Sequence, residues 1–125
     1  MDIAMVNDLE LERYITNIML DIGVPAHLKG YHYLREAILL SGRDMEVVSS
    51  VTKLLYPTIA KRFKTTDQKV ERAIRNAIEV SWERGNVETF EKLFGYSVMS
   101  GRNRPTNSEY IARIADTMRL DIKAM

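Results

Sequence analysis

The sequence contains no cysteine and no long apolar run, and each absence excludes a class of protein. Without cysteine the chain has no disulfide framework, no thiolate nucleophile and no thiolate metal site, as is common in a reducing cytoplasm. No stretch approaches the roughly 20 consecutive apolar residues that cross a bilayer. The first eight residues also lack the basic and apolar regions of an export signal. We therefore expect a cytoplasmic protein without a membrane partner.

A large excess of charge of one sign is missing too. The chain has 18 Lys and Arg residues against 17 Asp and Glu residues, a formal net charge of +1. This balance argues against a protein that coats DNA by bulk charge, and it suits a module with one basic face. The 125 residues, 46% of them apolar, are enough for one domain with a substantial core.

Motifs of enzymes and metal sites are also absent. The sequence has no glycine-rich phosphate loop, no His-Glu-x-x-His pair and no nucleophile elbow. His27 and His32 do not have the spacing of a helical ligand pair, and no third ligand is evident. We therefore expect no catalytic residue, no metal and no cofactor.

The apolar residues recur at steps of three and four along the chain, which is typical of helices that pack on one face. The sequence predicts an all-α fold, a compact bundle of about six helices. Asn7 with Glu10 and Thr106 with Glu109 have the spacing of N-terminal caps, and Gly85 is expected to be a left-handed C-terminal cap. The first expected helix begins after Asn7 and ends at Gly23, and the second runs from Tyr31 to about Leu40 and closes near Gly42. The third begins after Asp44 and has Val47, Val48, Val51, Leu54 and Leu55 on its apolar side. Further helices run from Asp67 to Arg84 and from Val87 to Phe94, and the last begins after Thr106.

The stretch from Thr58 to Trp82 predicts a helix-turn-helix. A short first helix begins at Pro57, either as a separate helix or as a continuation of the preceding one through a kink, and has Ile59, Ala60 and Phe63 on its apolar side. The second, longer helix has its own apolar stripe, formed by Val70, Ala73, Ile74, Ala77 and Ile78.

The turn between these two helices is polar and tight. Thr65 and Gln68 have the spacing of a capping box, which would start the second helix. Lys64 stands where a glycine is usual in such turns. Because lysine tolerates a positive φ poorly, we expect a looser turn than the common one.

The outward face of the second helix carries the side chains that can recognise DNA: Gln68, Glu71, Arg72, Arg75 and Asn76. Arginine can grip guanine with two hydrogen bonds, glutamate can accept one from cytosine, and lysine can neutralise phosphates. Between Thr58 and Asn76 six basic residues face two acidic ones, a local net charge of +4, so the remainder of the chain is about −3. This pattern favours DNA binding, although a basic amphipathic helix is also compatible with a solvated surface.

Four strings together resemble one family. The chain is similar to the DNA-binding effector domain of the sporulation-initiation response regulator, the master regulator of endospore formation in bacilli and clostridia. The resemblance covers nearly the whole chain. The strings are GVPAHLKGYHYLREAI at 23–38, TKLLYP at 52–57, VERAIRNAIE at 70–79 and RPTNSEYIA at 104–112.

The resemblance implies a domain organisation and a DNA target. In that family a phosphorylatable receiver domain precedes the effector domain, and phosphorylation produces dimers on tandem DNA boxes with a TGTCGAA-like core, which activate some promoters and repress others. We expect residues 1–6 to be a linker and residues 7–125 to be the effector domain, with the recognition helix at Asp67 to Arg84.

The resemblance also implies roles for individual residues. A surface around Val87 to Phe94 and Tyr96 to Met99 is expected to meet an RNA polymerase sigma factor, and the final helix a second copy of the protein. Asn76 stands where relatives often have histidine, so its phosphate contact is the less certain one. The implied residues are Glu71, Arg72 and Arg75 for base reading, Lys64, Thr66, Gln68, Lys69 and Asn76 for phosphates, and Glu91, Phe94 and Val98 for the sigma factor.

Arg102 and Arg104 lie in a basic loop, at 100–105, and two interpretations of it are equally open. These arginines could contact phosphates, or they could serve solubility alone. For the whole chain, the alternative to DNA binding is a helical adaptor that binds protein through Val87 to Phe94. An enzyme without a recognisable motif is the weakest interpretation.

Overall fold

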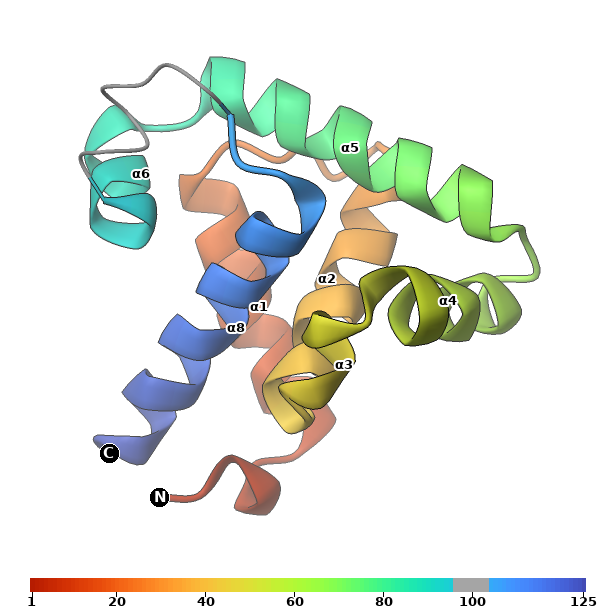
Figure 1. Ribbon diagram of the computed structural model, residues 1–125. Coiled ribbons are helices and arrows are strands. Elements are labelled where there is room, and N and C mark those ends of the chain that lie inside the picture. Colours follow the sequence, from red (N-terminus) through yellow and green to blue (C-terminus); the bar gives the residue numbers. More distant parts are fainter. Residues whose placement is uncertain (96–103) are drawn as a thin grey trace.

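The structure is a computed structural model that describes residues 1–95 and 104–125. The described residues form an all-helical bundle, and the predicted fold class is confirmed. In Figure 1 the longest helix, α5, lies across one side of the bundle, and α2 runs beneath it. The elements are η1 (Ile3–Met5), α1 (Asp8–Asp21), α2 (Lys29–Arg43), α3 (Glu46–Ser49), the π-helical turn η2 (Val51–Leu55), α4 (Tyr56–Arg62), α5 (Asp67–Arg84), α6 (Val87–Phe94) and α8 (Asn107–Lys123).

Helix α2 is the centre of the bundle and packs against α1, α5 and α8. Gly30 allows its close approach to α5, because a Cβ atom there would lie 2.0 Å from the carbonyl oxygen of Ala73. Helix α2 ends at Arg43, near Gly42 as predicted, but Gly42 itself lies inside the helix. A Cβ at Gly42 would meet the side chain of Met118 on α8, so this glycine serves a second helix crossing.

The caps that depend on neighbouring residues alone are confirmed. Asn7 accepts the backbone N–H of Glu10 at 2.9 Å. Thr106 and Glu109 form the reciprocal capping box that the sequence predicted at the start of α8. The apolar stripe of α8 is also buried, from Ile111 to Ile122.

The helix expected after Asp44 is divided into two elements, α3 and η2. Helix α3 ends at Ser49, and the π-helical turn η2 then leads directly into α4. The extra residue in a π-helical turn rotates the following side chains. As a result Val51 and Leu55 are buried, whereas Leu54 is 51% exposed and does not belong to the core, contrary to prediction.

Gly95 and Gly85 end their helices with different backbone conformations. Gly95 ends α6 with a φ of +82°. The prediction of a left-handed cap at Gly85 was wrong, because its φ is −69°. Gly85 is instead required by space, since a Cβ there would lie 2.6 Å from the carbonyl oxygen of Ile22 and 2.2 Å from the ring of Phe90.

Aromatic and hydroxyl side chains join the C-terminal end of α5 to α6 and to the start of α8. Phe90 of α6 stacks on Phe94 and meets the edge of Trp82. The buried Ser81 hydroxyl donates to the carbonyl of Ile22 at 2.6 Å and shares a hydrogen bond with the Tyr110 hydroxyl. Val87, the first residue of α6, is 57% exposed and lies outside this core.

Residues 1–6, expected to be a linker, include the short helix η1 and the buried Val6. Arg43 of α2 donates hydrogen bonds to the carbonyl oxygens of Ile3 at 2.7 Å and Val6 at 2.6 Å. It also pairs with Asp8 at the start of α1. The segment is therefore in contact with the bundle.

We predict that Gly30→Ala destabilises the protein by about 2–3 kcal/mol, because α2 and α5 must separate to admit the methyl group. Chemical denaturation monitored by circular dichroism measures this. Lys29→Ala, an exposed change in the same helical turn, should stay within about 0.5 kcal/mol of wild type. Equal stability of the two variants would contradict the close crossing.

Candidate nucleic-acid interface

Helices α4 and α5, with the turn between them, form the predicted helix-turn-helix (Figure 1). Ile59 and Ala60 of α4 are buried against the core, and so are Val70 and Ile74 of α5. Phe63, expected on the same apolar side, is 39% exposed and meets the edge of the Tyr33 ring. The core therefore fixes the inner sides of both helices and leaves their polar sides outside.

The turn differs from prediction in two ways. Lys64 does adopt a positive φ, of +55°, and the N–H of Thr65 donates to the carbonyl of Ala60 at 2.9 Å. The turn is thus closed in the way that a glycine would close it. The N-cap of α5 is Thr66, whose hydroxyl accepts from the N–H of Lys69. The prediction of Thr65 was wrong, because the backbone of Thr65 is engaged in closing the turn.

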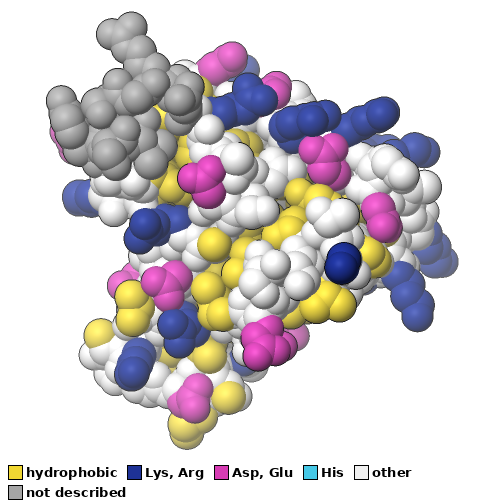
Figure 2. Space-filling view, viewed as in Figure 1, with side chains coloured by type: hydrophobic (Ala, Val, Ile, Leu, Met, Phe, Trp, Pro, Cys, Tyr) yellow, Lys and Arg dark blue, Asp and Glu magenta, His cyan; other side chains and the backbone are white. Residues whose placement is uncertain are grey.

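The outer face of α5 presents the residues that the sequence placed there. Arg72, on the side opposite the buried stripe, is exposed together with Gln68, Lys69, Arg75 and Asn76. Glu71 is half-buried on the flank that faces α8. Figure 2 shows Lys and Arg side chains gathered along this margin of the molecule, over α5 and α4.

Ion pairs divide the basic side chains of this region into two groups. Arg75 pairs with Glu71 at 3.2 Å, and Arg104 pairs with Glu79 at 2.9 Å. Within residues 1–95 and 104–125, no such pair involves the exposed Lys64, Lys69 or Arg72. In this second group, formed by Lys64, Lys69 and Arg72, no ion pair within the described residues offsets the positive charge, which can therefore attract an anion. Arg102, the other candidate of the basic loop, lies outside the described residues.

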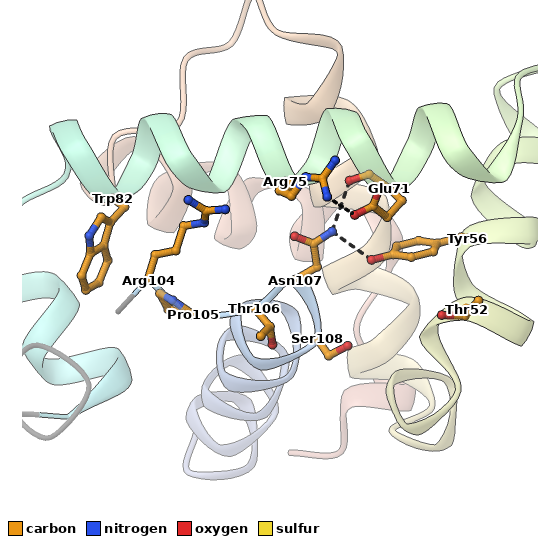
Figure 3. A pocket seen from close by; sticks show the side chains of 10 residues that line it. All are labelled: Thr52, Tyr56, Glu71, Arg75, Trp82, Arg104, Pro105, Thr106, Asn107 and Ser108. Carbon is orange, nitrogen blue, oxygen red and sulfur yellow. Dashed lines mark hydrogen bonds and ion pairs between the residues drawn. The ribbon is translucent and has the colours of Figure 1, made fainter. Parts of the chain in front are cut away.

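A concavity of about 710 Å³ opens beside the flank of α5 that carries Glu71 and Arg75. Its far wall is the start of α8, and its end is closed by Trp82 (Figure 3). Tyr56, the first residue of α4, is buried, and burial raises the pKa of its hydroxyl, although the hydrogen bond from Asn107 acts in the opposite direction. The lining residues are Thr52, Tyr56, Glu71, Arg75, Trp82, Arg104, Pro105, Thr106, Asn107 and Ser108.

The sequence did not indicate Asn107 or Tyr56 as part of this region. Asn107 donates to the Tyr56 hydroxyl at 2.9 Å and to the backbone carbonyl of Glu71 at 3.2 Å. A signal did exist, since a polar residue at the first position of a capped helix is free to reach outward. Nothing local identifies its partners, which lie 51 and 36 residues away.

An ion pair between the exposed Arg62 and the buried Glu36 joins α4 to α2. The Arg62 guanidinium donates to the Glu36 carboxylate at 2.6 Å. Burial raises the pKa of Glu36, and the opposing effect of the Arg62 charge is smaller. The pair joins the end of α4 that leads into the turn to the central helix, and burial disfavours the charged form of its carboxylate.

The described residues contain no group of three or more His, Asp or Glu side chains arranged to hold a metal ion. Both histidines, His27 and His32, have exposed side chains. Among the helices of the same residues, none has the length and apolarity needed to cross a bilayer. The geometry of this face is thus that of a polar, basic helix beside a concavity.

Residues 15–118 match the family model described as Sporulation initiation factor Spo0A C terminal. The chain belongs to this family. The match runs from α1 into the last turns of α8 and includes the whole helix-turn-helix. The resemblance seen in the sequence is therefore confirmed, and the chain is a sporulation-related, DNA-binding domain of a transcription factor. The family is one of DNA-binding domains and not of enzymes.

The Spo0A C-terminal fold places the predicted sigma-factor residues in different environments. Glu91 is exposed on α6, whereas Phe94 is only 6% exposed and packs against Phe90 and Tyr110. Val98 and the rest of Tyr96 to Met99 lie outside the described residues. Of the two described residues, Glu91 therefore has the side chain that a partner could reach.

We predict that Glu36→Gln removes a pH-dependent destabilisation. Because the folded-state pKa of Glu36 is raised, its contribution to stability falls as pH rises from the ordinary glutamate pKa through the folded one. Glutamine can still accept from Arg62 and does not titrate. The variant minus wild-type difference in free energy of unfolding, measured by urea denaturation from pH 4 upward, should therefore increase with pH over that window. A difference that is flat or falls with pH would contradict the raised pKa.

Proposed function

We propose that this domain recognises a specific DNA sequence by inserting α5 into the major groove. An α-helix with its side chains is about 10–12 Å across, close to the roughly 12 Å width of the groove. The observation that carries the proposal is the outer face of α5, where exposed arginine, lysine and amide side chains surround Arg72. Membership of a DNA-binding family supports the same interpretation.

Base reading is assigned to Glu71, Arg72 and Arg75. The two arginines can each donate a pair of hydrogen bonds to guanine, and the Glu71 carboxylate can accept from a cytosine amino group. The ion pair between Glu71 and Arg75, at 3.2 Å, favours a defined orientation of the Arg75 guanidinium before DNA arrives. Arg72 has the outermost position and is the first of the three to meet a base edge.

Phosphate contacts are assigned to residues around the turn and along the edge of α5. Lys64 and Lys69 supply exposed positive charge, and Thr66 is the cap from which α5 begins. The N-terminus of a helix favours anions, because its first N–H groups and the helix dipole point toward them. The assigned set is Lys64, Thr66, Gln68, Lys69 and Asn76.

We further propose that the target is a TGTCGAA-like box, and that the domain acts within a two-component response regulator to activate or repress promoters. Its partners would be double-stranded DNA, a second copy on a tandem box through α8, and an RNA polymerase sigma factor through the surface around Glu91. These assignments rest on the similarity of the chain to its family.

We predict that a labelled duplex with the TGTCGAA-like box binds more tightly than a scrambled duplex of equal composition. Arg72→Ala and Arg75→Ala should each weaken box binding by about 1–3 kcal/mol and relax discrimination at one base position. Fluorescence anisotropy at several salt concentrations measures both effects. Box binding equal to wild type in both variants would defeat the base-reading assignment. Absence of all DNA binding by wild type would favour the helical adaptor instead.

We predict that Lys69→Ala weakens binding to the box and to the scrambled duplex by a similar factor. Loss of one phosphate contact should also reduce the slope of log affinity against log salt by about one. The same titrations provide the measurement. Glu83→Ala, an exposed change near the other end of α5, should leave the slope unchanged. An unaltered slope for Lys69→Ala would remove this lysine from the phosphate contacts.

A further inference from the structure

The segment that leads into α8 contacts the recognition helix at two separate points. Asn107 donates its amide N–H to the backbone carbonyl of Glu71 at 3.2 Å, and Arg104 pairs with the Glu79 carboxylate at 2.9 Å. Glu71 and Glu79 are eight residues apart on α5, a distance of about 12 Å along the helix. Figure 3 shows both residues of the segment pointing toward α5.

The same asparagine also holds the first helix of the helix-turn-helix. Its amide donates to the hydroxyl of Tyr56 at 2.9 Å, and Tyr56 is the buried first residue of α4. One side chain therefore connects α8, α4 and α5. Without it, the relative position of α4 and α5 at this end would depend on apolar packing, which is less directional than a hydrogen bond.

The segment has little freedom of its own. Pro105 is buried, and Thr106 and Glu109 satisfy each other's backbone in the capping box. Asn107 is the first residue of a helix of 17 residues that is buried along one whole face. The side-chain amide of Asn107 is consequently held in a fixed position by α8. Through its hydrogen bond with the carbonyl of Glu71, it fixes the position of α5 relative to α8.

The two contacts enclose the residues that read the DNA. Glu71, Arg75 and Glu79 follow each other at steps of four on one side of α5, so Arg75 lies between the two points of attachment. The carbonyl of Glu71 that Asn107 contacts belongs to the helical turn that joins Glu71 to Arg75. A shift of this turn would move the guanidinium of Arg75 and the carboxylate of Glu71 together.

We propose that Asn107, assisted by Arg104, is a positioning residue that sets the sequence specificity of DNA binding. This inference rests on the proposed base-reading role of Glu71 and Arg75. Hydrogen bonds to base edges require accurate placement of the donor, whereas the charge of a lysine near a phosphate tolerates displacement. Loss of the Asn107 contacts therefore reduces discrimination between sequences and leaves affinity for DNA in general almost unchanged.

The experiment compares Asn107→Ala with Ser108→Ala, an exposed change in the same helical turn that lines the same concavity. Anisotropy titrations use the TGTCGAA-like duplex and its scrambled control. For Asn107→Ala the preference for the box should fall by about three- to tenfold, as expected for loss of one or two hydrogen bonds. Affinity for the scrambled duplex and the salt slope should remain those of wild type. Ser108→Ala should keep the full preference.

A second variant separates positioning from general loss of structure. Tyr56→Phe removes one acceptor of the Asn107 amide and keeps the contact with Glu71, so its loss of preference should be smaller. In the Asn107→Ala background the same change should cause no further loss, because the shared hydrogen bond is already gone. Additive losses in the double variant would overturn the proposal, as would equal weakening of box and scrambled binding by Asn107→Ala.

Arg72→Ala distinguishes failure of this inference from failure of the proposed function. If Arg72→Ala loses the preference for the box and Asn107→Ala keeps it, base reading stands and the positioning role is overturned. If wild type itself shows no preference, the proposed function fails, and the positioning role fails with it. Loss of preference in both variants, with Ser108→Ala unaffected, supports the inference.

Discussion

The close crossing of α2 and α5 is the contact on which the rest of the structure depends. Gly30 has no side chain, and the backbone of α5 at Ala73 occupies the space that a Cβ would need. This brings α5 against the central helix of the bundle, with Val70, Ile74, Ala77 and Ile78 of its apolar stripe buried. The polar face of α5 is then directed outward, and its orientation is decided by the packing of a buried surface.

The second determinant is the contact of α8 with the side of α5. The core of α8 is buried beside α2 and α5, so the segment that precedes it must run along the recognition helix. Its polar residues take up partners on α4 and α5 there. The helix-turn-helix is therefore supported from the inside by α2 and from one side by the start of α8.

This arrangement gives the two sides of the outer face different electrostatic character. On the side facing α8, Arg75 and Arg104 are neutralised by carboxylates. Around the turn and the outer edge, Lys64, Lys69 and Arg72 are exposed cations. The ion-paired arginines thus lie beside the concavity, whereas the cations without an ion pair in the described part of the chain lie where the phosphate backbone of DNA can approach.

Features that depend on adjacent residues could be predicted from the sequence. The caps at Asn7 and Thr106, the helical class and the two helices around the turn follow from spacing of three and four residues. The N-cap of α5 was predicted one residue early, at Thr65 instead of Thr66, because two threonines stand side by side and only the closed turn decides between them. The roles of Gly42 and Gly85 were also missed, since the atoms that crowd them come from other helices.

The sequence by itself determined that the chain is helical, which face of α5 is polar and basic, and to which family it belongs. Only the tertiary structure decided that Leu54 lies outside the core, that the buried Glu36 pairs with Arg62, and that Asn107 reaches Glu71 and Tyr56. The physical reason is distance along the chain. Helix formation and capping are local, whereas these contacts join residues 26 to 51 positions apart, and the register of the π-helical turn is set by the core around it.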